Sequence, residues 1–333
     1  MARIALDAMG GDHAPQAPIA AALLAAADLG SGHTLQLVGQ EQVIREELAS
    51  QLTDASPEVQ AAAARFEVIH APDVILMSDK PSVAIRGKPN SSMTVGLRLQ
   101  AEGNSDAFVS AGNTGAQMAA SVFVLRLHDG LQRPAIGTVF PTASQPVVVL
   151  DSGANVDCSA QELLNFAQLG HVYAKDILGR SNPVIGLLSI GEEAEKGNAA
   201  VKEAHQLLLA SGLNFIGNVE GRDVAMGACD RGPFDVVVCD GFTGNVLLKF
   251  YEAAPKLFGG LMLKAGVSKE TLGAALGQLD YAKYGGAPLL GVKGVSIICH
   301  GKSSPEALKN GIKAGLRAVE SGMSSHIGQR VHA

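Results

Sequence analysis

The chain has 333 residues, of which 47% are apolar and 17% charged, and its formal net charge is −6. A chain of this length can form one large α/β domain or two smaller ones, with enough surface to bury in a substantial core. Nucleic-acid binding is disfavoured, because it needs a cationic surface and usually stacking aromatic rings, whereas the chain has 26 basic against 32 acidic residues and only 4% aromatic residues.

Short apolar runs alternate along the chain with longer helix-like segments. The runs that we expect to be strands are, in chain order, residues 4–7, 35–38, 66–70, 107–110, 147–150, 184–189, 213–217, 236–239 and 295–300. Segments rich in Ala, Leu, Glu and Lys lie between several of them, at residues 19–29, 116–127, 161–178, 198–210 and 305–320. Strands that are apolar at nearly every position and separated by helices indicate a mainly parallel sheet covered on both faces. The pattern therefore predicts an α/β fold.

One stretch breaks this alternation. Residues 255–290 contain no predicted strand, and two helix-like pieces are separated near residues 266–268. No tandem repeat and no Pro/Ser-rich linker marks a firm domain boundary. We therefore predict a single domain over residues 1–333, with a helical excursion at about 255–290 inside it.

Polar residues collect directly after the predicted strands. Six such turns cover residues 7–12, 110–115, 151–155, 218–223, 240–245 and 300–304. In a parallel sheet all the strands end at one edge, and this is the edge where open α/β folds bind ligands. Gly, Asn and Asp also simply make turns, but six turns that each mix glycine with polar side chains favour a binding site. We expect all six to face one crevice.

The turn at residues 110–115 leads into a helix. Gly112 and Gly115 allow a ligand to approach the backbone, and Asn113 or Thr114 can cap the helix. Free N–H groups and the helix dipole favour an anion at such a place, although a capped helix with nothing bound is the alternative. A dinucleotide site is disfavoured, because the strict G-x-G-x-x-G pattern is absent.

Residues 296–303 resemble a Walker A loop only in part. Ser296 replaces the first glycine, and the residues after it look like strand interior, so we exclude nucleotide hydrolysis. Lys302 at the following helix start can still contribute a cation to an anion pocket. His13 and His300 are lone loop histidines, which more often form turn hydrogen bonds than act in catalysis.

Arg222 and Asp240 each allow two interpretations. Arg222 can clamp a phosphate with two hydrogen bonds, or it can form a structural ion pair with Glu220 or Asp223. Asp240 can orient a ligand or stabilise the start of a helix.

No G-x-S-x-G elbow or C-x-x-C pair occurs, so we expect no metal site and inert packing roles for the cysteines, which are Cys158, Cys229, Cys239 and Cys299.

Five motifs together resemble the bacterial PlsX-type phosphate acyltransferase family: residues 7–15, 110–116, 217–223, 240–245 and 284–291. The match runs in order over essentially the whole chain, and the first motif, Asp-Ala-Met-Gly-Gly-Asp-His-Ala-Pro, is the most specific. The resemblance implies transfer of a long fatty acyl group from acyl carrier protein to inorganic phosphate, which gives acyl phosphate for phospholipid synthesis. It also implies a three-layer Rossmann-like body akin to phosphotransacetylases and the isocitrate-dehydrogenase-like group, a homodimer, and a cytoplasmic enzyme loosely attached to the membrane.

On this resemblance we assign roles to the residues of the turns. The expected catalytic residues are Asp12, Asn113, Glu220, Arg222, Asp223 and Asp240. The expected substrate- and phosphate-binding residues are Gly10, Gly11, Ser110, Gly112, Thr114, Gly115, Asn245, Lys249 and His300. Phosphate dianion is itself a nucleophile, so the reaction needs a pocket that holds it against the thioester carbonyl and no metal or cofactor. Lys302 departs from the small residue expected in its motif.

The predicted excursion carries an apolar stripe with helical spacing. Its members are Leu257, Phe258, Leu261, Met262 and Leu263, flanked by Lys256 and Lys264. Such a segment can lie on a lipid surface with its cations near headgroups, or it can pack against a dimer partner or the core. The sequence leaves both interpretations open.

Other functions also remain open. A phosphotransacetylase-like enzyme acting on a short acyl-CoA and a non-catalytic scaffold in lipid metabolism are the alternatives. An oxidoreductase on a related body is disfavoured by the missing nucleotide fingerprint. A cationic patch would suit the acidic carrier protein, and its candidate residues are Arg86, Lys88, Arg98 and Lys283.

Overall fold

The computed structural model describes residues 1–30, 32–277 and 284–331. The chain divides into two compact units, the first formed by Met1–His128 and Ala282–Gly328, the second by Asp129–Tyr281 and Gln329–Ala333. The single domain that we predict over residues 1–333 stays a prediction.

The sheet of the first unit follows the strand order β3-β2-β1-β4-β14-β13. Its strands are β1 (Ala2–Asp7), β2 (His33–Gly39), β3 (Glu67–His70), β4 (Ala107–Ser110), β13 (Ala287–Leu290) and β14 (Ser296–Ile298). All neighbouring pairs are parallel except β13 with β14. The central strand β4 is buried at every position, as a sheet covered on both faces requires.

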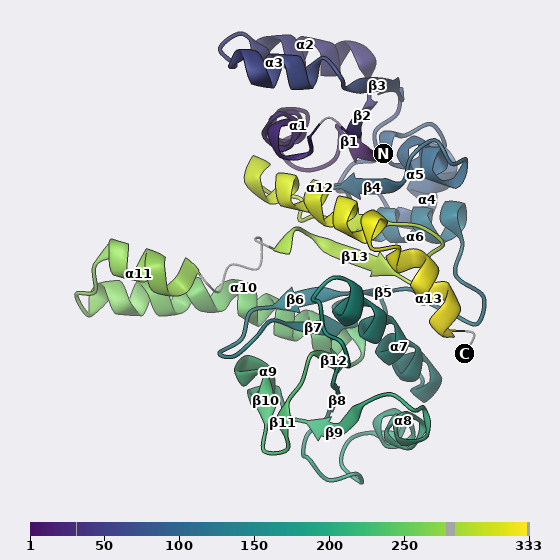
Figure 1. Ribbon diagram of the computed structural model, residues 1–333, viewed down its shortest axis with the longest axis vertical. Helices are drawn as coiled ribbons and strands as arrows, with labels where there is room; N and C mark the ends of the chain where they lie inside the picture. The colour runs from purple at the N-terminus through teal and green to yellow at the C-terminus, as the bar shows by residue number, and fades with distance from the viewer. Residues whose placement is uncertain (31, 278–283, 332–333) are drawn as a thin grey trace. The chain divides into compact units, whose positions relative to one another are not determined.

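Helices cover both faces of this sheet (Figure 1). Helix α1 packs on α12, and α12 contacts β1 and β4; on the opposite face α5 packs on α6 and contacts the same two strands. The helices of this part are α1 (Gln16–Asp28), α2 (Glu41–Leu52), α3 (Pro57–Ala63), α4 (Pro81–Gly87), α5 (Ser92–Ala101), α6 (Thr114–Leu125) and α12 (Pro305–Glu320), followed by α13 (Met323–Val331). The first unit is thus a three-layer α/β/α body.

The second unit has a sheet of order β6-β7-β12-β8-β9, in which only β6 runs antiparallel to its neighbour. Its strands are β5 (Ala135–Ile136), β6 (Thr138–Phe140), β7 (Val147–Leu150), β8 (Ile185–Leu188), β9 (Phe215–Val219) and β12 (Val236–Val238), with the hairpin β10 (Ala228–Cys229) and β11 (Gly232–Pro233). Its helices are α7 (Ala160–Asp176), α8 (Ala199–Ala210), α9 (Gly221–Met226), α10 (Gly241–Lys264) and α11 (Lys269–Leu276). Helix α7 packs on β7 and β12.

Local sequence explains where the main helices begin. Ser159 and Glu162 form a capping box at the start of α7. Ser304 accepts a hydrogen bond from Ala307 N at the start of α12, where Pro305 occupies the first turn. The prediction of a mainly parallel α/β fold is confirmed, since each of the nine predicted strands corresponds to an observed one.

The predicted absence of a strand in the excursion is wrong. Helix α10 begins at Gly241, well before the excursion, and strand β13 occupies Ala287–Leu290 inside it. The run was unrecognised because Pro288 cannot donate a backbone hydrogen bond and two glycines precede it. The two predicted helical pieces and their separation are confirmed, since α10 ends at Lys264 and α11 begins at Lys269. Residues 278–283, with the cation candidate Lys283, lie outside the described residues.

Candidate functional site

Three of the predicted turns lie together at one edge of the first unit's sheet. Strands β1, β4 and β14 are parallel neighbours, so their carboxyl ends meet. Ser110 Oγ donates a hydrogen bond to Asp7 Oδ2 at 2.7 Å and accepts one from Gly112 N at 2.9 Å. Asp12 N donates to Gly301 O at 2.8 Å. We call these joined turns, residues 7–12, 110–115 and 300–304, the turn cluster.

Asp7 lies at the centre of the turn cluster and is only 2% exposed. Burial raises the pKa of its carboxyl, against the opposing effect of hydrogen bonds from Ser92, Ser110 and the backbone of Met9 and Gly10. A raised carboxyl pKa favours the folded state below the ordinary pKa, and this contribution is lost as the pH rises through the folded value. Asp7 therefore does not drive acid unfolding.

The glycines of the turn cluster allow its turns to approach each other. A Cβ at Gly10 would lie 2.5 Å from Asp7 Oδ2 and 2.8 Å from Ser110 Oγ. Gly11 has a φ of +103°, which side chains rarely adopt. Ser110 is fully buried and engaged with Asp7 and Gly112. Its observed contacts hold the turns together, and its predicted contact with phosphate stays a prediction.

Asn113, one of the two residues that the sequence offers as a cap, caps α6. Its Oδ1 accepts a hydrogen bond from Ala116 N at 3.0 Å, while its Nδ2 donates to Met77 O at 3.1 Å and Asp79 O at 3.0 Å. The amide thus ties the turn cluster to the segment before α4, and a catalytic role for Asn113 stays a prediction. Thr114, exposed on the first turn of α6, has no role that the structure tests.

The remaining residues of the turn cluster are partly solvent-exposed. Gly115 approaches Pro81, because a Cβ there would lie 2.8 Å from Pro81 Cγ. His300 is exposed, and its Nδ1 accepts a hydrogen bond from Lys302 N at 3.1 Å. This is the turn hydrogen bond that we expected of a lone loop histidine. Lys302 is exposed as well.

In the second unit, the turns after β7 and β12 interlock. Asp151 is buried, and its carboxylate accepts hydrogen bonds from Ile136 N and Asn155 N at 3.0 and 2.7 Å. Burial raises its pKa and outweighs the opposing effect of these bonds. Gly241 N donates to Asn155 O at 2.7 Å, and a Cβ at Gly244 would lie 1.9 Å from Asp151 O. The first turn of α10 therefore lies directly against the turn after β7.

The other predicted residues of α10 have observed local partners. Asp240 caps the helix by accepting from Thr243 N at 2.8 Å and Thr243 Oγ1 at 2.9 Å, so it does stabilise the helix start. Asn245 is exposed next to Gly153. Lys249 is exposed and pairs with Glu252 at 2.9 Å. Ligand contacts of these three residues stay predictions.

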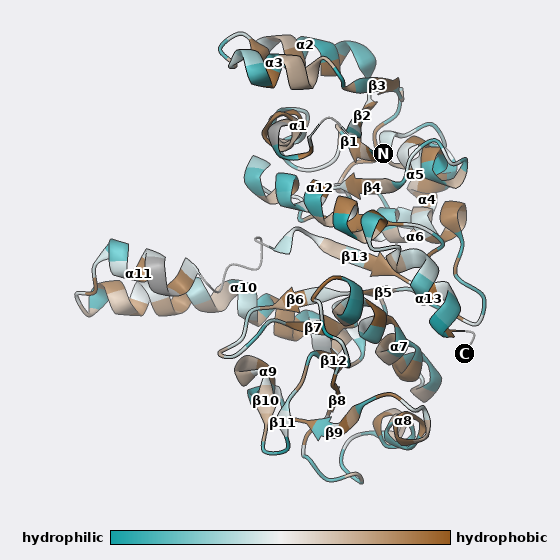
Figure 2. Ribbon diagram, in the orientation of Figure 1, coloured by the Kyte–Doolittle hydropathy of each residue, from teal (hydrophilic) through white to brown (hydrophobic). Residues whose placement is uncertain are grey.

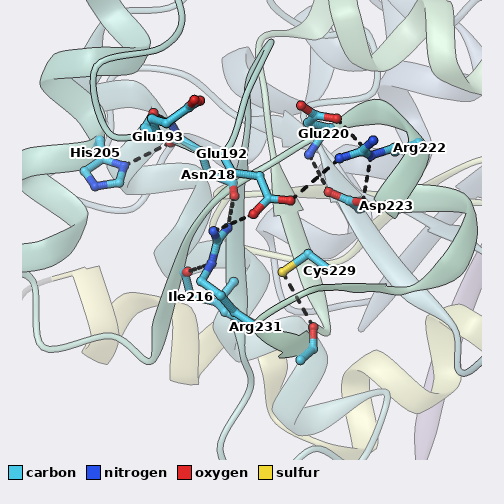
Figure 3. Close-up of polar contacts among 11 residues, drawn as sticks. Glu192, Glu193, His205, Ile216, Asn218, Glu220, Arg222, Asp223, Cys229 and Arg231 are labelled. Carbon is cyan, nitrogen blue, oxygen red and sulfur yellow. Dashed lines mark hydrogen bonds and ion pairs between the residues drawn. The ribbon is translucent and has the colours of Figure 1, made fainter.

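Arg222 lies among carboxylates, on the first turn of α9 (Figure 3). Its Nε lies 2.9 Å from Glu220 Oε2 and 3.7 Å from Asp223 Oδ1, and its Nη2 lies 3.9 Å from Glu192 Oε1. Arg231 Nη1 pairs with the other oxygen of Glu192 at 2.9 Å. The structure thus shows the ion-pair interpretation of Arg222. Its side chain is 73% exposed, so the phosphate-clamp interpretation stays a prediction.

Sequence reasoning missed Glu192 and Arg231. Glu192 follows β8, so the rule that selected the six turns also points to it. Arg231 gave no signal, because it lies in the hairpin β10–β11; its Nε donates to Ile216 O at 2.8 Å, and its Nη2 donates to Asn218 O. Asp7 and Asp151 were inside the recognised turns, but their burial was not readable from the sequence.

Comparison with known proteins identifies the chain's relatives. The family model described as "Fatty acid synthesis protein" matches residues 2–326. The phosphate acyltransferase of Desulforamulus reducens is 46% identical over 97% of this chain and 95% of its own length. That of Moorella thermoacetica is 44% identical over 98% of this chain and 95% of its own length. The chain belongs to the phosphate acyltransferase family.

Solved structures place this phosphate acyltransferase among related folds. A phosphotransacetylase from Streptococcus pyogenes superposes with a TM-score of 0.65 at 19% identity, covering 96% of this chain and 94% of that one. The 4-hydroxythreonine-4-phosphate dehydrogenase of Klebsiella pneumoniae gives a TM-score of 0.55 at 16% identity, covering 96% and 100%. At these identities the likeness concerns the fold alone. The predicted likeness in fold to phosphotransacetylases is confirmed.

Among the residues that the structure describes in this family member, no group of three or more His, Cys, Asp or Glu side chains could hold a metal ion. Burial raises the pKa of Cys158 and of Cys299 to about 12. Both are therefore thiols at neutral pH, in agreement with the packing role that we expect of them. The turns of the two units belong to separate parts of the chain, and their common crevice stays a prediction.

Proposed function

We propose that the protein transfers a long-chain fatty acyl group from acyl carrier protein to inorganic phosphate, giving acyl phosphate for phospholipid synthesis. Its phosphate acyltransferase relatives and the fatty acid synthesis family model support this choice. The structural observation that carries it is the turn cluster, where glycine-rich backbone follows β1 and β4 and precedes α6. Anions bind at such strand ends and helix starts in open α/β folds.

The reaction needs positioning more than a reactive side chain. A phosphate oxygen attacks the thioester carbon, a C–O bond forms, the C–S bond breaks, and the carrier's sulfur leaves with the proton that phosphate gives up. Holding phosphate against the thioester makes this step effectively unimolecular. Gly10 N already donates to the Asp7 carboxylate, so we assign the anion contacts to backbone N–H groups of Gly11, Thr114 and Gly115. One donor to the developing oxyanion is typically worth about 3 kcal/mol.

A second candidate is a phosphotransacetylase-like enzyme acting on a short acyl-CoA, which the fold likeness to phosphotransacetylases favours. One assay separates the candidates. The protein is incubated with phosphate and either palmitoyl acyl carrier protein or acetyl-CoA, and acyl phosphate is trapped with hydroxylamine. We expect hydroxamate from the carrier-protein donor and only in the presence of phosphate. Product from acetyl-CoA alone would favour the second candidate, and no product from either donor would favour a scaffold.

We expect Arg222→Ala to raise the KM for phosphate about tenfold. The effect is no larger because the Arg222 guanidinium is exposed and already pairs with Glu220, so its hydrogen bond to phosphate adds little to the binding free energy. The measurement is the initial rate against phosphate concentration. Arg45→Ala is the matched control, because Arg45 is 62% exposed, pairs with Glu41 at 2.8 Å and lies in none of the predicted turns. An unaltered phosphate dependence in Arg222→Ala would remove this residue from the site.

We also propose that the protein is a homodimer in the cytoplasm that attaches to the inner face of the membrane through the end of α10. Leu257 and Leu261 are each 55% exposed, and Phe258 and Met262 are exposed too, so this stripe is not core. Figure 2 shows hydrophobic residues along the hairpin of α10 and α11. In the described part of the chain, no helix is both long and apolar enough to cross a bilayer.

Leu261→Glu tests the lipid contact. We expect liposome flotation to fall about tenfold, because an apolar contact is replaced by a charge that anionic headgroups repel. Leu209→Glu is the matched control, because Leu209 is 60% exposed on α8 and its replacement introduces the same charge away from the stripe. Sedimentation should show that both variants keep the parent's oligomeric state. Undiminished flotation would contradict the lipid contact, and loss of the dimer would assign the stripe to the partner subunit.

A further inference from the structure

Two large apolar side chains lie exposed next to the turn cluster. Leu76 is 54% exposed and Met77 is 47% exposed. They belong to the segment between β3 and α4, residues 71–80, which neither the predicted site nor the proposed function uses. We call Leu76 and Met77 the apolar rim.

The backbone beneath the apolar rim is held by hydrogen bonds. Asn113 Nδ2 donates to the carbonyl oxygens of Met77 and Asp79. Asp79 Oδ2 in turn accepts a hydrogen bond from Leu76 N at 2.9 Å and lies 2.5 Å from Lys88 Nζ. The Asp79 carboxylate and the carbonyl oxygens of Met77 and Asp79 thus have partners within the protein, while the two side chains of the apolar rim are exposed.

The apolar rim borders two turns of the turn cluster. A Cβ at Gly301 would lie 2.9 Å from Met77 Cε and 3.5 Å from Asp12 Oδ1, so Met77 lies next to the start of the 300–304 turn and within reach of the turn after β1. Asn113, which holds the segment, is itself part of the 110–115 turn. Apolar surface and glycine-rich backbone therefore lie side by side within the first unit.

This arrangement fits the geometry of the reaction. An attacking phosphate oxygen and the thioester carbon must come within about 3–3.5 Å of each other. The acyl chain begins at that same carbon, so its first methylene groups must lie next to the bound phosphate. Methylene groups leave water favourably only for apolar surroundings. Of the described residues, Leu76 and Met77 supply exposed apolar surface at this place.

We propose that the apolar rim receives the first methylene groups of the donor's acyl chain and makes the enzyme prefer acyl chains that carry these groups over the acetyl group, which has none. The proposal rests on the proposed function, because it places the acyl donor at the turn cluster. It assigns a substrate contact to Leu76 and Met77, and it gives Asn113 a positioning role through the carbonyl oxygens of Met77 and Asp79.

The test replaces Met77 by glutamine, which keeps the length of the side chain and makes its end polar, and Leu76 by asparagine. The initial rate of acyl hydroxamate formation is measured with the palmitoyl and with the acetyl thioester of acyl carrier protein. We expect kcat/KM for the palmitoyl donor to fall about tenfold in each variant, and kcat/KM for the acetyl donor, which has no methylene group, to change less than threefold. Val83→Asn is the matched control, because Val83 is 65% exposed on the neighbouring helix α4 and should change neither rate.

The outcomes distinguish the two proposals. If the parent forms hydroxamate and the variants lose both rates equally, or lose neither, the apolar rim does not receive the acyl chain. If the parent forms no hydroxamate from either donor, the proposed function fails and the apolar rim fails with it. Thermal unfolding of each variant should match the parent, since both side chains are half in solvent.

Discussion

We expect Gly10→Ala to lower kcat/KM for phosphate about 100-fold, which corresponds to about 2.7 kcal/mol of transition-state stabilisation. The added methyl group would lie 2.5 Å from Asp7 Oδ2, 2.8 Å from Ser110 Oγ and 2.9 Å from Gly112 N. These three atoms belong to the hydrogen-bonded link between the turns after β1 and β4. The turns must move apart to admit the methyl group, and their backbone N–H groups then no longer converge on one anion.

The control for this variant is Gly87→Ala. Apart from its chain neighbours and the backbone of its own helix, no heavy atom of the described residues lies within 4 Å of a Cβ built at Gly87, which ends α4. We expect that variant to keep the parent's rate. Hydroxamate formation gives the rates, and thermal unfolding shows whether Gly10→Ala is folded at the assay temperature. A folded Gly10→Ala protein with a rate within threefold of the parent would show that the turn cluster does not bind phosphate.

The second large effect is on stability. We expect Gly244→Ala to lower the free energy of unfolding by about 3 kcal/mol, at the upper end of the usual cost of overpacking. A Cβ at this position would lie 1.9 Å from Asp151 O and 3.1 Å from Cys239 Sγ. The carbonyl oxygen belongs to a turn that Asp151 itself fixes through several backbone hydrogen bonds. The turn therefore cannot yield, and the start of α10 must move away from it.

Gly260→Ala is the matched control in the same helix. Gly260 is exposed, and a Cβ there meets no heavy atom of the described residues within 4 Å beyond its chain neighbours and its own helix backbone. We expect this variant to be more stable by up to about 1 kcal/mol, because alanine favours a helix over glycine. The midpoint of thermal unfolding, measured on all three proteins at one concentration, checks both signs. Equal midpoints for Gly244→Ala and Gly260→Ala would contradict the close contact at Gly244.

The sequence predicts the strands of this fold well where each is buried and followed by turn residues. Residues 107–110 and 147–150 were predicted to the residue, as β4 and β7. Both are buried at all four positions, and a recognised turn begins at or directly after the last residue of each. The prediction failed at β13. Two glycines and Pro288 make its sequence unlike that of a strand, and it is recognised only from its antiparallel pairing with β14.

The candidate site was predictable in composition but less so in contacts. The rule that polar residues follow parallel strands found the turns that the structure joins through Asp7 and Ser110. It could not show that Arg222 meets Glu192, because that contact depends on the parallel pairing of β8 with β9. It also could not show that the side-chain amide of Asn113 donates a hydrogen bond to Asp79 O, in the segment before α4. Such long-range partners are set by tertiary packing, which local patterns do not encode.

Strand β14 begins only at residue 296 of 333, yet it lies between β4 and β13 in the sheet. On the ribosome, strands β1 to β4 emerge first, and one side of β4 stays without its neighbour until everything up to Ile298 has been made. The sheet β6-β7-β12-β8-β9 lies wholly within the intervening stretch and can close earlier. Newly made chains therefore carry an open β-edge for most of translation, which is the kind of edge that chaperones shield from aggregation.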